Sequence, residues 1–372
     1  MENKLNWGIK KVIKKSGNIK KFFDSKDPIL LKKFDMKLFH FSNSFSEKLD
    51  SSKSYMKFWV KTFRGKLALL SLLGLILLPL MTQSPYYLGI FITPMIFTIF
   101  AGSWDFLAGY AGQVSFGHSI FFGIAGYMTS YCLRYFNFHW TISLLFGALA
   151  GVGVGLIIGI PCLRVKGPYL ALVTMVFSLI LFNIFMMREL EPFLGGSEGI
   201  SGVRNISENI VVTYLISLII MVISVIILII LGKSNLGTVL KSIRDDDKGS
   251  KASGINVSRY KIIAFMISGF FAGIAGGLFS MQFRGVSPGV FLPLYSFYAI
   301  VMAALGGLGT IVGSALGSFI FWLLYELLRD FADISVFILA IILILVIRFA
   351  EQGLLKPALE HLKDAWDLLI GK

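Results

Sequence analysis

Charged side chains are scarce in this sequence. Asp, Glu, Lys and Arg make up 15% of the 372 residues, whereas hydrophobic residues make up 56%. A soluble globular domain carries about 25% charged residues, so the shortfall excludes an ordinary soluble protein and favours a chain solvated by lipid. Because one crossing helix needs about 20 apolar residues, we predict an all-α, polytopic membrane helix bundle of about eight to ten transmembrane segments, some of them broken or re-entrant.

Residues that carry cofactor chemistry are also few. The two cysteines, Cys132 and Cys162, give no disulfide framework, and the four histidines are scattered without metal-ligand spacing. The tripeptide Gly232-Lys233-Ser234 resembles the end of a phosphate-binding loop, but the position that needs the first glycine holds Ile227. We therefore expect no metal site, no cofactor and no ATP bound by this chain.

Acidic groups are nearly missing from the long apolar runs. Asp105 and His118 lie in a Gly-rich stretch rather than inside a clean run. Proton-driven and ion-driven carriers usually keep such groups at membrane depth, so their scarcity counts against a carrier or channel that works alone. A membrane-embedded enzyme would need His, Asp or Glu gathered at one membrane face, which the sequence does not offer. An energy source outside the chain is favoured, with the ATP-independent carrier or channel as the alternative.

Positive charge is concentrated at the N-terminus. Residues 1–66 hold 17 Lys or Arg and 6 Asp or Glu, which supplies +11 of the total charge of +14. Basic residues before a first span are held on the cytoplasmic side, next to anionic lipid, which is favoured here over nucleic acid as the partner. We expect a basic cytoplasmic arm at 1–62, a transmembrane domain at 63–350 and a polar tail at 351–372.

The apolar runs give the order of the spans. Spans are predicted near 65–83, 87–103, 120–136, 139–160, 169–187, 210–231, 262–282 and 333–347. The stretch 294–328 is too long for one straight span, and GGLGT at 306–310 interrupts it, so we expect two shorter helices that meet at a break. Alternation then places 188–209 outside and the Lys/Arg-bearing loops 162–168 and 233–261 in the cytoplasm, as the positive-inside rule requires.

Glycines four residues apart line one face of the span at 139–160. They are Gly147, Gly151, Gly155 and Gly159. Lipid gives little hydrophobic drive for helix association, so close backbone contact through small residues is a main source of packing energy. This face is predicted to pack against another helix.

The Gly-rich stretch 104–119 is the most informative segment at membrane depth. Its glycines interrupt regular helix, and irregular backbone is tolerated there only inside protein or against a water-filled cavity. Broken helices often hold the substrate site of transporters. The candidate pathway residues are Gly109, Gly112, Gln113, Ser115 and His118. The alternative is a cytoplasmic or structural turn.

The segment 233–261 is the longest charged stretch inside the chain. Leu236, Val239, Leu240 and Ile243 follow helical spacing, so a short helix would present one apolar face. Arg244, Asp245 and Asp246 lie mainly off that face, and glycines at 249 and 254 are expected to end the helix. Such a helix fits the groove of a partner, with a surface helix lying on lipid as the alternative.

Several long stretches resemble one family. They are GYAGQVSFGHSIFFGIAGY (109–127), PCLRVKGPYLALVT (161–174), LGGSEGISGV (194–203), SIRDDDKGSKASGINVSRYK (242–261), VSPGVF (286–291) and ALGGLGTIVGSALG (304–317). They are similar to the M-type permease of bacterial branched-chain amino acid ABC importers, and urea permeases share much of the pattern. The chain departs from that family at 249–252, where GSKA stands in place of Ala-Ala-Glu-Ala, so an earlier helix end is expected.

The resemblance implies a transport subunit without catalysis of its own, in the bacterial inner membrane. A related second permease, two cytoplasmic ABC ATPases that bind ATP and an extracytoplasmic substrate-binding protein would be its partners. The segment that couples it to the ATPase would hold Leu236, Leu240, Ile243, Arg244, Asp245, Asp246 and Gly254. The implied substrate is a branched-chain amino acid, with urea or a short amide as the alternative.

Overall fold

The computed structural model describes residues 63–163, 165, 167–328 and 341. The chain divides into two compact units, Met1–Leu69 and Leu70–Lys372. The described part of the second unit is a helix bundle with one short strand pair, so the predicted helical membrane bundle is confirmed. The arm at 1–62, the tail and the predicted span at 333–347 lie outside the described residues, and the predicted domain limits stay a prediction.

Helices follow the apolar runs closely. The long ones are α4 (Phe63–Met81), α5 (Pro85–Asp105), α6 (Ser119–Arg134), α7 (Trp140–Cys162), α8 (Pro168–Phe185), α10 (Ile210–Lys233), α13 (Val257–Gln282), α14 (Pro293–Gly306) and α15 (Ile311–Leu327). Short elements connect them: the π-helix η1 (Phe106–Tyr110), η2 (Arg188–Leu190), α9 (Glu191–Leu194), η3 (Gly196–Glu198), α11 (Asn235–Asp245), α12 (Asp247–Ala252) and η4 (Pro288–Phe291).

Five described helices are long and apolar enough to cross a membrane. They are α5 with its π-helical extension, α7, α8, α10 and α13. Helices α14 and α15 are bent by 112° at a short break, as in a broken span or a re-entrant loop, which confirms the predicted break at 306–310. Helix α6 has 16 residues, about 24 Å, which is shorter than a straight crossing needs. The described part thus accounts for five or six of the predicted eight to ten segments.

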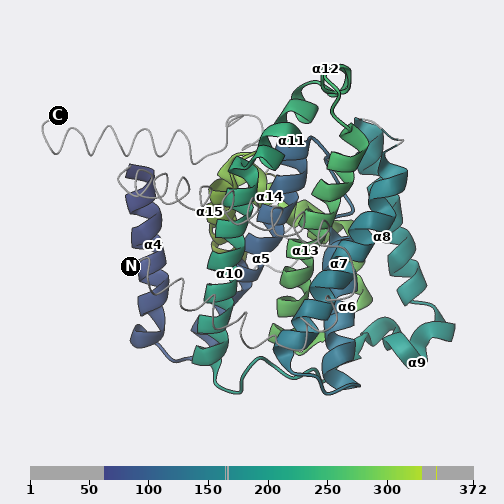
Figure 1. Cartoon of the computed structure of the whole chain (residues 1–372). Helices are drawn as coiled ribbons and strands as arrows, with labels where there is room; N and C mark the ends of the chain where they lie inside the picture. Colours follow the sequence, from purple (N-terminus) through teal and green to yellow (C-terminus); the bar gives the residue numbers. More distant parts are fainter. Residues whose placement is uncertain (1–62, 164, 166, 329–340, 342–372) are drawn as a thin grey trace, which may run out of the picture. The chain divides into compact units, whose positions relative to one another are not determined.

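Helices α5 and α13 form the centre of the bundle. In an apolar stretch of 18 residues, 83% of α5 and 61% of α13 is buried inside the protein. The corresponding shares for α8, α10 and α7 are 28%, 33% and 39%. The outer three helices expose leucine, isoleucine and phenylalanine side chains, which suits contact with lipid tails. Figure 1 shows α5 and α13 between these outer helices.

The predicted glycine face packs α7 onto α13. A side chain at Gly151 would collide with the carbonyl oxygen of Gly269, and one at Gly155 would lie 2.7 Å from the carbonyl oxygen of Phe265. The two backbones therefore touch, as small residues allow in membrane helix pairs. This contact confirms the prediction for that face.

The bundle has two distinct ends. Strands β1 (Ile200–Ser201) and β2 (Gly285–Val286) pair antiparallel and join the loops that precede α10 and follow α13. Figure 1 shows α11 and α12 at the opposite end, which we call the α11 end. The loops predicted on opposite sides of the membrane, 188–209 and 233–261, therefore lie at opposite ends of the bundle.

Candidate functional site

Helix α5 does not stop where its apolar run ends. It widens into the π-helix η1, and the chain then runs irregularly from Gly112 to His118 before α6 begins. Gly112 has a φ of +66°, which an L side chain rarely adopts, and a Cβ there would meet Cγ of Arg244 at 2.8 Å. Single π-turns inside α-helices occur frequently at functional sites. The predicted interruption at 104–119 is thus a π-helix and a glycine turn that lie against α11.

Two cationic side chains of α11 hold the π-helix. Nη1 of Arg244 donates a 2.6 Å hydrogen bond to the carbonyl oxygen of Gly109. Nζ of Lys241 lies 4.8 Å from the centre of the Tyr110 ring, within range of a cation–π interaction. A π-helix leaves carbonyl groups without regular partners, so the guanidinium supplies one of them. A displacement of α11 would therefore also displace η1.

A third segment, the break between α14 and α15, meets the same turn. Oδ1 of Asp105 accepts a 2.6 Å hydrogen bond from the backbone N–H of Gly309, which lies 204 residues away. The carboxylate thus sits at the N-terminus of α15, the positive end of that helix dipole. A Cβ on Gly109 would lie 2.7 Å from the Gly309 Cα, so only glycine allows this approach. We call the contact between Asp105, Gly109, Arg244 and Gly309 the junction.

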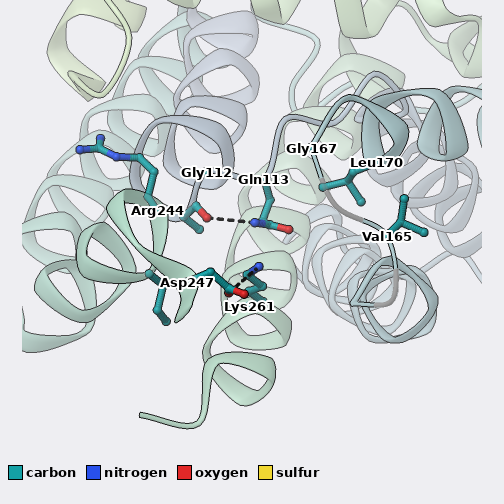
Figure 2. A pocket seen from close by; sticks show the side chains of 10 residues that line it. Gly112, Gln113, Val165, Gly167, Leu170, Arg244, Asp247 and Lys261 are labelled. Atoms are coloured by element: carbon teal, nitrogen blue, oxygen red, sulfur yellow. Dashed lines mark hydrogen bonds and ion pairs between the residues drawn. The ribbon is translucent and has the colours of Figure 1, made fainter. Parts of the chain in front are cut away.

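A cavity of about 180 Å³ lies beside the junction at the α11 end. Its walls come from the turn after η1, the loop before α8, α11, α12 and the start of α13: Ala111, Gly112, Gln113, Val165, Gly167, Leu170, Ile243, Arg244, Asp247 and Lys261. Figure 2 shows Val165 and Leu170 on one side and Gln113, Asp247 and Lys261 near the middle. The cavity therefore joins the segments predicted for the pathway and for coupling.

One carboxylate organises the charges at the cavity. Oδ1 of Asp247 is 3.1 Å from Nζ of Lys261, and Oδ2 accepts a 3.1 Å hydrogen bond from Nζ of Lys251. Burial alone would raise the pKa of the Asp247 carboxyl, but the two ammonium groups outweigh it and hold this pKa below its ordinary value. Asp247 is therefore charged at neutral pH and pins α12 to α13.

Two predicted pathway residues lie away from this cavity. His118 is fully buried, and its Nε2 is 2.9 Å from Oγ of Ser103. Since Ser103 donates its own hydrogen to the Phe100 carbonyl, Nε2 carries the imidazole hydrogen. Ser115 is buried, with its carbonyl oxygen bonded to the Trp104 indole. Of the five candidates, Gly109 lies at the junction, and Gly112 and Gln113 line the cavity. A pathway role for all five stays a prediction.

The apolar face of α11 is turned towards the chain's own helices. Leu240 is 0% exposed and Ile243 is 2% exposed, and Leu236 is partly buried against the same core. The prediction that this face itself enters a partner's groove is therefore corrected, because α10, α13 and η1 already cover it. The exposed side of the segment instead carries Asp245, Asp246 and Gly254.

The helix also ends elsewhere than expected. Helix α11 ends at Asp245, and the Asp246 side chain accepts the N–H of Lys248, which caps a second helix. Gly249 lies inside α12, so it does not end the first helix, and the segment at 249–252 is helical. Gly254 follows α12 with a φ of +82°, as a helix-ending glycine does.

Sequence reasoning missed three residues of this region. Gly309 was part of a predicted break but gave no sign of its partner, Asp105. Lys261 and Asp247 carried no distinguishing pattern, because the ion pair between them joins α13 to α12 across a loop. Only the Gly-rich GGLGT run signalled that backbone atoms there approach another segment closely.

A comparison with known protein families shows which family this chain belongs to. Residues 86–347 match the family model described as the permease component of a branched-chain amino acid transport system. This match spans most of the chain, the junction and the cavity, and the chain belongs to that family. It is therefore a multi-pass membrane permease of an ABC importer, a transport component rather than an enzyme.

Curated relatives show the same class. The chain is 28% identical over 298 residues to the high-affinity branched-chain amino acid transport system permease protein LivM of Salmonella typhimurium, covering 72% of this chain and 70% of the relative. It is 27% identical to LivM of Escherichia coli over the same length. The autoinducer 2 import system permease protein LsrC of Yersinia enterocolitica is 28% identical over 50% of this chain and 52% of its own length. No solved structure matches the chain significantly.

Proposed function

We propose that this chain translocates branched-chain amino acids across the bacterial cytoplasmic membrane. The observation that carries the proposal is the length of the similarity to two LivM proteins, 72% of this chain, against 50% for an autoinducer 2 permease and 52% for a fructose permease. Because these two matches are shorter, a sugar-like substrate is less favoured than a branched-chain amino acid. Urea or a short amide, and transport without ATP, are the alternatives that the experiment below separates.

The proposed assembly contains subunits that this chain does not supply. A related permease completes the membrane part, two cytoplasmic ABC ATPases bind ATP, and a substrate-binding protein delivers the amino acid from outside. ATP would bind to those ATPases and not to this chain, because its Gly232-Lys233-Ser234 tripeptide lacks the preceding glycine of a phosphate-binding loop. Lys and Arg at the α11 end support a cytoplasmic position for this end. The net charge of +11 in residues 1–66 supports the same position for the N-terminus.

The junction supports a mechanism for coupling. An ATPase would contact the exposed polar side of α11 and α12, which carries Asp245, Asp246 and Lys248. Displacement of α11 would pull on Gly109 through Arg244, and Asp105 would pass the movement to the start of α15. A π-helix and a bent helix pair deform more easily than straight helices, so the bundle would open and close at these two places.

Co-purification and reconstitution test the proposal. The full chain, isolated in mild detergent, is expected to carry a sister permease, two ATPases and the binding protein. With ATP inside the vesicles and the binding protein outside, proteoliposomes of this assembly should take up radiolabelled leucine, isoleucine and valine through the complexes whose ATPases face the lumen. Uptake of fructose or urea in preference to leucine would overturn the substrate, and uptake by the chain alone without ATP would overturn the coupling.

A further inference from the structure

The cavity at the α11 end has the size of a small metabolite. Its volume of about 180 Å³ lies below the range of about 300–1,000 Å³ of drug-sized ligand pockets, so only a small molecule fits. Such a space is suited to one free amino acid.

The walls divide into an apolar and a charged part. Val165, Leu170 and Ile243 supply aliphatic surface, and Asp247 and Lys261 supply one charge of each sign. A zwitterion with an aliphatic side chain meets all of these, since its ammonium faces the carboxylate and its carboxylate faces the lysine.

The position of the cavity gives a ligand there a mechanical effect. Ile243 and Asp247 belong to the segment α11–α12, whereas Gln113, Leu170 and Lys261 belong to the turn after η1 and to the membrane helices α8 and α13. A molecule between them would fasten the segment that receives the ATPase movement to the part that must move relative to it.

We propose that this cavity is a regulatory site for a free aliphatic α-amino acid on the side of the membrane where α11 lies, and that its occupation slows transport. The proposal rests on the proposed function, which makes this side cytoplasmic and the ligand the transported product. Accumulated product would thereby restrain its own import. The site is separate from any delivery site at the strand end of the bundle.

The test uses the complete permease–ATPase complex in nanodiscs, without the soluble binding protein. Binding of radiolabelled leucine is measured at equilibrium, with valine, inorganic phosphate and acetate as competitors. The decisive variants are Lys261→Gln and Lys251→Gln, because both lysines lie 3.1 Å from Asp247 and only Lys261 lines the cavity. We expect leucine to bind about tenfold more weakly to the Lys261 variant, the effect of one lost charge-assisted hydrogen bond, and unchanged to the Lys251 variant.

A second variant guards against a folding defect. Val165→Phe adds bulk inside the cavity without removing a charge, and leucine binding should fall while the ATPases still co-purify. Proteoliposomes loaded with leucine on the α11 side should import more slowly than empty ones, and this difference should vanish with Lys261→Gln. Equal loss in both lysine variants, displacement by phosphate as effective as by valine, or unsaturable binding would overturn the proposal. Normal ATP-driven leucine uptake that internal leucine does not slow would overturn the regulatory site and leave the proposed function intact. Saturable leucine binding without any leucine uptake would overturn the proposed function and leave the binding site intact.

Discussion

The hydrogen bond from Arg244 to Gly109 predicts how the transporter loses coupling. Arg244→Met keeps an unbranched, flexible side chain, shorter than arginine, and removes the 2.6 Å charge-assisted hydrogen bond to the π-helix. A hydrogen bond to a charged group contributes about 1.5–3 kcal/mol, and the side chain is 39% exposed, so we expect about 1–2 kcal/mol here. That free energy changes the ratio of docked to undocked α11 by a factor of about 5–30.

The assay compares ATP hydrolysis and leucine uptake in the same proteoliposomes. ATP hydrolysis should persist, because Asp245, Asp246 and Lys248 stay on the exposed side, although Asp245 loses its 2.8 Å ion pair with Arg244. Leucine moved per ATP should fall several-fold. Arg259→Met is the matched control, since it makes the same chemical change at an exposed position at the start of α13. Normal leucine uptake per ATP in the Arg244 variant, or the same loss in both variants, would show that the junction does not transmit the movement.

Three further predictions follow from the same region. Asp105→Ala should lower the thermal stability of the purified chain by about 1–3 kcal/mol, because the Gly309 N–H loses its buried acceptor, and Asp105→Asn, which keeps an oxygen there, should lose less; equal losses would contradict the cap. Leu240→Ala should destabilise the docking of α11 by about 2–5 kcal/mol, since its side chain is fully buried, and faster amide hydrogen exchange confined to α11 would report it; unchanged exchange would contradict this packing. The pKa of Asp247 is lowered in the folded chain, so its ion pairs stabilise the fold fully above the ordinary pKa of 3.8, and this stabilisation is lost as the pH falls through the lower folded-state pKa. The difference in melting temperature between wild type and Asp247→Asn should therefore stay constant between about pH 5 and 8.

Much of the helical layout could be predicted from sequence because the signal for a span is local. A run such as 210–231 contains its own hydropathy, and α10 covers Ile210–Lys233. The break at 306–310 was equally local, since glycines interrupt a stretch that is too long for one span. The amphipathic spacing of Leu236, Leu240 and Ile243 correctly predicted a helix with one apolar face.

What covers that face was beyond local reasoning. Amphipathic spacing says that a face seeks apolar contact, not whether the contact lies in the same chain or in a partner. The chain's own helices α10 and α13 supply it, so the exposed charges face outward instead. The end of α11 at Asp245 was likewise missed. Asp246 caps the next helix, and Gly249 lies inside that helix and does not end the first one.

The sequence by itself determined that this is a helical membrane protein, where most of its spans run and where they break. Hydropathy, glycine spacing and charge act over a few residues or over one helix face, so one chain read in order contains them. Only the tertiary structure decided that Asp105 accepts a hydrogen bond from a backbone N–H 204 residues away, that Arg244 holds the π-helix, and that Lys261 and Asp247 face one cavity. These contacts depend on distances between segments remote in the chain, which packing of the whole bundle sets and no local pattern encodes.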